Sequence, residues 1–108
     1  MPWLFLMSYF FGGAFLANAV PHFISGMMGR PFQSPFAQPP GQGLSSSTVN
    51  VLWGFFNLAV GYVLVCRVDF RLRNTSDTIA CGTGIFLIAF FSARHVGRFH
   101  GGNQPKRP

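Results

Sequence analysis

Charged residues occupy ten of the 108 positions, and their placement divides the chain into three long uncharged stretches, 1–29, 31–66 and 78–93. A helix that crosses the hydrocarbon core of a bilayer, about 30 Å thick, needs roughly 20 mainly apolar residues. The layout of the charges therefore predicts an integral membrane protein with three transmembrane helices, over residues 3–28, 49–66 and 78–97.

The predicted fold class is all-α. The uncharged stretches lack the alternation of apolar and polar residues that marks a barrel strand, and a chain this short supplies few strands. Lipid cannot satisfy open backbone groups, so helices are the remaining option. Three spans in about 100 residues leave no room for a soluble domain, and we expect one membrane domain over 1–108.

The connection between the first two predicted helices, residues 29–48, contains prolines at positions 31, 35, 39 and 40. Each proline removes a backbone donor and disfavours helix in its predecessor, so this proline-rich loop is predicted to be extended or turn-rich. Phe32 and Phe36 are spaced to anchor it at the headgroup level, and residues 45–48 offer N-cap oxygens to the next helix. A re-entrant loop or lid over a cavity is the alternative.

The remaining segments are short and polar. Residues 67–78 are predicted to form a simple turn between antiparallel helices, and residues 100–108, rich in glycine and proline, a flexible tail. Cys66 and Cys81 flank the turn. They form either a disulfide or a pair of small buried thiols, and the sequence leaves both open.

Six polar residues inside the predicted spans all lie in the half of the bilayer nearest the proline-rich loop. At 1.5 Å per residue, each falls within roughly 15 Å of that side. Residues 18 and 22 are four apart and residues 50 and 57 are seven apart, so each pair shares one helix face. The sequence therefore predicts a polar seam, which is also the candidate ligand site, made of Asn18, His22, Asn50, Asn57, Arg94 and His95.

Two kinds of function would use such a seam. Hydrogen bonding between helices is a common role of intramembrane Asn and His. Our leading expectation is accordingly a non-enzymatic structural or accessory subunit that packs with itself or with a partner. The alternative is a small-molecule or ion-handling membrane protein, in which Arg94 meets an anionic group and His22 or His95 handles a proton.

Several chemistries are excluded by where the acidic and sulfur-containing residues lie. Both carboxylates, Asp69 and Asp77, lie in the 67–78 turn. One subunit therefore cannot build a carboxylate proton relay or a two-carboxylate hydrolytic site within its spans. The cysteines lie on the opposite side from the histidines, which argues against a mixed Cys/His metal site. We expect no catalytic residue, no metal and no cofactor.

The basic residues lie at the ends of the predicted spans, where they suit anionic headgroups. The formal charge of +6 therefore indicates membrane lipid as a partner and not nucleic acid, since no basic face is visible. A homo-oligomer or a larger membrane complex is also expected. Five basic residues on the side of the loop and tail, against three on the other, favour a cytoplasmic proline-rich loop and C-terminus.

Small residues repeat at helical spacing. Gly13 and Ala17, and Ala80 and Gly84, are four apart, while Gly54 and Gly61 are seven apart. Such positions allow helices to approach closely.

The segment ANAVPHFISGMMGRPFQSPFAQPPGQGLSSSTVNVLWGFFNLAVGY, residues 17–62, combines a His-containing first span, a G-R-P-F…P-F-A…P-P-G loop and an N-V-L-W-G second span. In this it resembles small uncharacterised multi-pass bacterial membrane proteins. The resemblance implies a bacterial inner-membrane setting and no catalytic activity.

Overall fold

The computed structural model describes residues 2–100, which form three helices: α1 (Pro2–Met27), α2 (Ser47–Cys66) and α3 (Thr75–His100). All three are long and apolar enough to cross a membrane. Their bounds lie within three residues of the predicted spans. The mainly helical fold is thus as the sequence predicted, whereas most of the predicted flexible tail lies outside the described residues.

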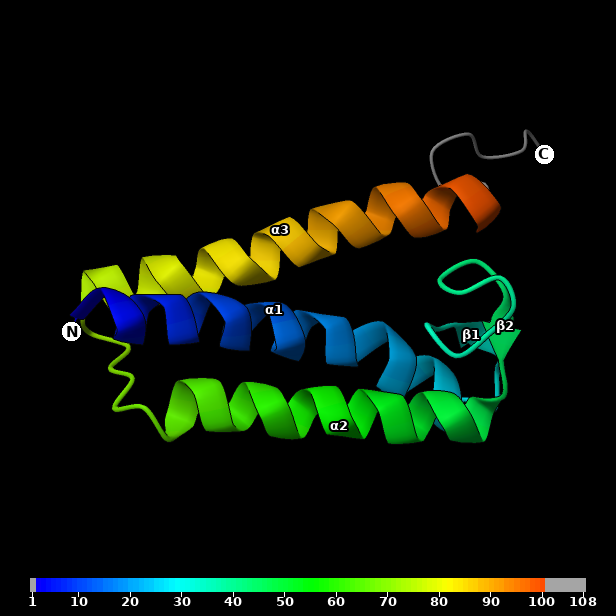
Figure 1. The fold of residues 1–108 in the computed structure, drawn as a ribbon, viewed down its shortest axis with the longest axis horizontal. Coiled ribbons are helices and arrows are strands. Elements are labelled where there is room, and N and C mark those ends of the chain that lie inside the picture. The colour runs from blue at the N-terminus through cyan, green and yellow to red at the C-terminus, as the bar shows by residue number, and fades with distance from the viewer. Residues whose placement is uncertain (1, 101–108) are drawn as a thin grey trace.

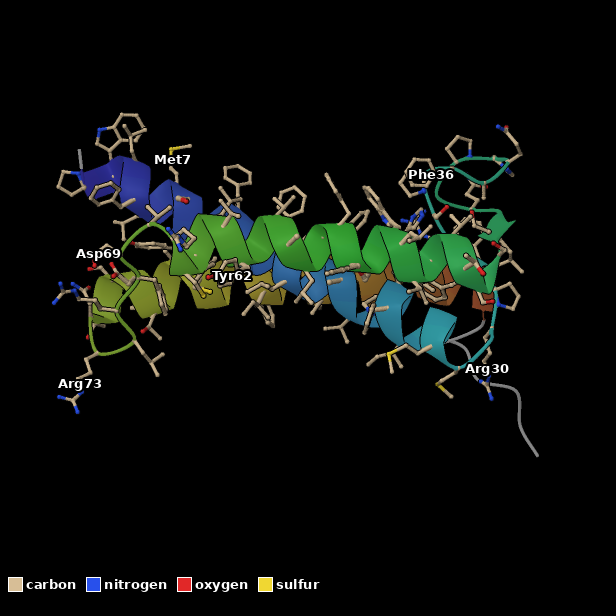
Figure 2. All side chains as sticks on the ribbon, turned by 90° about the horizontal axis from the view of Figure 1, so that it is seen from below. Met7, Arg30, Phe36, Tyr62, Asp69 and Arg73 are labelled. Carbon is tan, nitrogen blue, oxygen red and sulfur yellow. The ribbon has the colours of Figure 1, made fainter. Side chains whose placement is uncertain are left out.

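The helices lie side by side in one layer, with α1 in the middle (Figure 1). Helix α1 packs extensively against both α2 and α3, and no comparable contact joins α2 to α3 in the described part of the chain. The N-terminus and the α2–α3 turn share one end of the layer, while the proline-rich loop and the end of α3 share the other (Figure 1). Arg73 and Arg30 lie at these opposite ends (Figure 2).

Side chains at the helix starts explain where α2 and α3 begin. Ser46 caps α2, its hydroxyl accepting from the Val49 amide at 3.2 Å. The side-chain oxygen of Asn74 accepts from the Asp77 amide at 3.3 Å, and the Asp77 carboxylate accepts from the Arg71 amide at 3.1 Å. The bonds to the Val49 and Asp77 amides satisfy donors that a helix start leaves without partners, and the bond to the Arg71 amide ties the preceding turn to α3.

The proline-rich loop contains a short structural element that the sequence did not predict. Strand β1 (Phe32–Gln33) pairs antiparallel with β2 (Leu44–Ser45), with Phe32 opposite Ser45. The hydroxyls of Ser34 and Ser45 lie 2.5 Å apart across this pairing, which closes the loop on itself. Phe36 is exposed at this end of the molecule (Figure 2).

The three helices meet most closely at the end that carries the α2–α3 turn. Tyr9, Val65 and Cys81, one from each helix, form the buried core there. The Tyr9 hydroxyl donates to the Val68 carbonyl, and its ring packs edge-on against Phe70 at 5.2 Å between centroids. The loop end has no equivalent three-helix core among residues 2–100.

Candidate functional site

Helices α1 and α2 touch along most of their length because glycines line their interface. Gly12 and Gly26 of α1 face Val65 and Val51 of α2, and Gly54 and Gly61 of α2 face Phe23 and Leu16 of α1. A Cβ built on Gly54 would lie 2.6 Å from the Phe23 backbone nitrogen, closer than atoms can approach. The predicted packing role of Gly54 and Gly61 is confirmed.

Asn50 is the most connected side chain of this interface and is fully buried. Its amide nitrogen lies 3.1–3.2 Å from the carbonyl oxygens of Phe32, Ser45 and Ser46. Its oxygen lies 2.8 Å from Nδ1 of His22. An amide oxygen only accepts, so His22 Nδ1 donates. One residue of α2 therefore ties together α1, both strands of the loop and its own helix start.

A second polar contact lies deeper in the same interface. Asn18 donates to the Asn57 side-chain oxygen at 3.1 Å, and the Asn57 nitrogen donates to the Trp53 carbonyl at 2.8 Å. Asn57 is 1% exposed, so these bonds replace the water that its amide lacks. Four of the six predicted seam residues thus pair with one another across α1 and α2, and we keep the name seam for Asn18, His22, Asn50 and Asn57.

The other two predicted residues lie on α3, and among the described residues neither of them hydrogen-bonds to the seam. His95 Nε2 lies 2.9 Å from the Gly41 carbonyl oxygen, which only accepts, so His95 donates to the proline-rich loop. Its ring stacks on Phe91 with centroids 5.4 Å apart. Arg94 is exposed. The six residues were grouped by their depth along the helices. Depth alone does not show that α2 and α3 pack on different sides of α1.

A cleft of about 950 Å³ lies between α1, α3 and the proline-rich loop. Apolar side chains make up most of its wall, among them Val20, Phe91 and Val96. The lining also includes six side chains that can hydrogen-bond: Asn18, His22, Gln33, Ser34, Ser92 and His95. Asn18 and His22 belong both to the seam and to the lining of the cleft, so the cleft borders the α1 side of the seam.

Two features of α1 and α3 open this cleft. Gly13 and Gly84 bring the helices into backbone contact near the turn end, where a Cβ on Gly84 would overlap the Phe10 carbonyl. Beyond this crossing α3 draws away from α1, and α1 bends towards α2 over its last turns (Figure 1). Pro21 lies in that part of α1, and a proline within a helix removes a backbone hydrogen bond and kinks it.

Gln33, one of the residues that line the cleft, has a buried side-chain oxygen without a hydrogen-bond partner among the described residues. Its side chain is 3% exposed, and its nitrogen donates to the Gln42 carbonyl at 3.3 Å. Its oxygen, Oε1, is buried with no hydrogen-bond partner in the described structure. The indole nitrogen of Trp53 is the other such buried atom, and it lies outside the cleft lining.

Neither cysteine is cross-linked. Both are free thiols, but only Cys81 is buried and Cys66 is exposed, so they form neither a disulfide nor the pair of buried thiols that was the alternative. Within the described residues, no three His, Cys, Asp or Glu side chains lie close enough together to hold a metal ion.

Sequence reasoning did not identify Gln33 or the cleft. Gln33 lies in the proline-rich loop, outside the predicted spans, and only intramembrane polar residues were considered as candidates. No pattern in the run FQS marks Gln33, because Gln33 and the adjacent Ser34 are both buried, whereas alternation along a strand would bury only one of them.

Comparison with known proteins adds no relative. No protein-family model, curated protein or solved structure matches the chain. The functional argument therefore depends on the geometry of the seam and the cleft.

Proposed function

We propose that the protein is a non-enzymatic integral membrane protein that crosses the bilayer three times and acts as a structural or accessory subunit, packing with itself or a partner. The observation that carries this proposal is that the seam residues bond to one another and to backbone carbonyls. Polar groups used in this way hold helices together. Each seam side chain is therefore engaged in a hydrogen bond that joins parts of this fold.

The surface of the layer supports a subunit role. Of the three helices, α3 has the smallest buried share, and it exposes Phe86, Phe90 and Phe91. A Cβ on Gly82 would meet nothing within 4 Å, so a neighbouring helix has room to approach α3 there. Small residues on exposed helix faces allow such close packing within a membrane.

The proposed setting is a bacterial inner membrane with the proline-rich loop and the C-terminus in the cytoplasm. The loop resemblance and the five-to-three distribution of basic residues support it. The test is labelling of single cysteines introduced at Gln42 and Asn103, in a chain whose own two cysteines are replaced by alanine. A membrane-impermeant maleimide should label neither in intact spheroplasts and both after lysis. Labelling of either one before lysis would contradict this orientation.

The subunit proposal is tested by extraction from native membrane directly into lipid nanodiscs, followed by native mass spectrometry. We expect a mass that corresponds to several copies of the 11.9 kDa chain or to the chain with a defined partner. A population made only of single chains would contradict the subunit role. Release of the protein from membranes by alkaline carbonate would contradict the three spans.

Small-molecule binding is a second candidate function, and the cleft is the observation that favours it. Ion handling gains no such support, because no charged side chain lines the cleft within the described residues. The wall is mostly apolar, which suits an uncharged ligand.

A further inference from the structure

We propose that the loop end of α3 binds one anionic phospholipid, whose phosphate group lies between Arg94 and Arg98 and whose acyl chain lies along Leu87 and Phe91. This goes beyond a general attraction of basic residues to headgroups, because it assigns one saturable site to one helix. The proposal rests on the three membrane spans proposed above, which carbonate extraction tests separately.

The four residues form a single stripe along α3. They fall at positions i, i+4, i+7 and i+11, which share one face of a helix. All four are exposed, Leu87 at 49% and Phe91 at 61%. Helix α1 packs against a different face of α3, through Cys81 and Gly84, and α2 makes no comparable contact with α3 among residues 2–100. In a membrane the stripe is therefore open to lipid.

The order of the side chains along the stripe matches the order of groups in a phospholipid. The two apolar residues come first, and the two arginines follow towards the loop end. Helix α3 has 26 residues, so at 1.5 Å per residue it is about 39 Å long, more than the roughly 30 Å of the hydrocarbon core. Arg94 and Arg98 lie within about the last 9 Å. Their long side chains can therefore reach the headgroups while Leu87 and Phe91 lie beside the acyl chains.

No acidic side chain competes for these two arginines. The only carboxylate side chains of the sequence are Asp69 and Asp77, and both belong to the turn end, where Asp69 lies 3.6 Å from Arg71. Arg94 and Arg98 make no ion pair within the described part of the chain. Two guanidinium groups on adjacent turns of one helix can share a phosphate, to which arginine donates paired hydrogen bonds.

The lack of carboxylates also distinguishes between classes of phospholipid. Phosphatidylcholine and phosphatidylethanolamine carry a positive group next to the phosphate. At the loop end, opposite Asp69 in the molecule (Figure 2), that group would meet Arg30, Arg94 and Arg98 and no acidic side chain of this chain. Like charges repel, and phosphatidylglycerol has no such positive group. We therefore expect the site to prefer phosphatidylglycerol, which is the probe used below.

The first experiment titrates the full chain in detergent micelles with phosphatidylglycerol or phosphatidylcholine and counts bound lipids by native mass spectrometry. We expect one phosphatidylglycerol per chain, at concentrations where phosphatidylcholine is not retained. Arg94→Gln combined with Arg98→Gln should weaken retention roughly thirtyfold, about fivefold for each arginine near a headgroup. Arg67→Gln combined with Arg73→Gln removes two exposed arginines from the turn end. This control should weaken retention by less than about twofold, because a bilayer thickness separates it from the site.

The second experiment locates the bound lipid with a phosphatidylglycerol that carries a diazirine in its acyl chain. In phosphatidylcholine nanodiscs, labelling should saturate, map to residues 87–91 and be displaced by unlabelled phosphatidylglycerol. Arg94→Lys combined with Arg98→Lys keeps both charges and should keep the preference for phosphatidylglycerol. Circular dichroism checks that each variant keeps its helices. If the glutamine pair does not fold, the comparison of the two lipids and the labelling map on the unaltered chain still decide.

The proposal is overturned if the two glutamine pairs weaken retention alike, since binding would then be diffuse attraction to surface charge. Equal retention of the two lipids, or labelling that maps away from residues 87–91, would also overturn it. So would loss of a co-purifying protein from the Arg94 and Arg98 pair with lipid retention unchanged, which would assign the arginines to acidic side chains of that partner. None of these outcomes alters the number of chains in the complex, which tests the subunit role.

Discussion

The two faces of α1 differ in how they meet their neighbours. Towards α2, glycines and four hydrogen-bonded polar side chains keep the helices in contact from the turn end to the loop end. Towards α3, contact at Gly13 and Gly84 is followed by separation and a mostly apolar cleft. In a membrane, apolar side chains alone give no hydrophobic force that closes such a gap, because lipid fills it equally well. Close packing and polar bonds are what distinguish a sealed interface from an open one.

The largest effect should come from adding a methyl group to the sealed interface. Gly54→Ala places a Cβ against the backbone of Phe23, and the helices must separate to accommodate it. We expect a loss of roughly 3 kcal/mol in the free energy of unfolding, the upper end for an overpacked site. Gly82→Ala on α3 is the matched control, with open space around the new Cβ and a small gain in helix propensity. Equal stabilities of the two variants in detergent, followed by circular dichroism, would show that the interface is not tightly packed.

Asn50→Ala should be next in size. It leaves the His22 donor and three carbonyl oxygens without the Asn50 amide. Leaving buried groups unsatisfied in this way costs about 2 kcal/mol. Hydrogen exchange should also rise in both the loop and the start of α2, because Asn50 links them. A rise confined to α2 would mean that the loop is held by other contacts.

His95→Ala tests the hydrogen bond between His95 of α3 and Gly41 of the proline-rich loop. We expect a loss of about 1 kcal/mol in the free energy of unfolding, together with faster hydrogen exchange of residues 40–43. Arg94→Ala, at the exposed neighbouring position, should change stability by less than about 0.5 kcal/mol. A larger effect of Arg94→Ala would contradict the view that α3 is joined to the loop through His95.

The smallest effect sharpens the account of the seam itself. A double-mutant cycle with Asn18→Ala and Asn57→Ala should give a coupling energy of about 0.6 kcal/mol, typical of polar pairs between membrane helices. Steric trapping in bilayers would measure it. A coupling energy of zero would mean that the bond between Asn18 and Asn57 does not stabilise the interface, and that the polar contribution of the seam comes from Asn50 and His22.

Much of the fold could be predicted because charges and prolines mark the ends of apolar stretches. The same regularity explains why Asn18 with His22, and Asn50 with Asn57, could be assigned to shared faces: helical periodicity within one element determines that relation. Capping is less visible, and Asn74 could be recognised as the start of α3 only from its bond to the Asp77 amide.

The cleft and the separate placement of Arg94 and His95 could not be predicted in the same way. Counting residues gives depth along a helix, but not the side of α1 on which α3 lies. That choice depends on the close contacts of Gly13 with Cys81 and of Gly84 with Phe10, and on the course of α1 around Pro21. The buried oxygen of Gln33 was also not predicted. Gln33 lies in strand β1, and the four prolines of the loop gave no reason to expect strand pairing there.

The central position of α1 has a consequence for synthesis. Every side chain that makes a seam bond, and every loop carbonyl that Asn50 contacts, belongs to the first 57 residues. The pairing of α1 with α2 can therefore be completed while α3 is still within the ribosome. Helix α3 then packs against a preformed hairpin of α1 and α2. The α1 and loop residues of the cleft are therefore in place before α3 supplies the opposite wall.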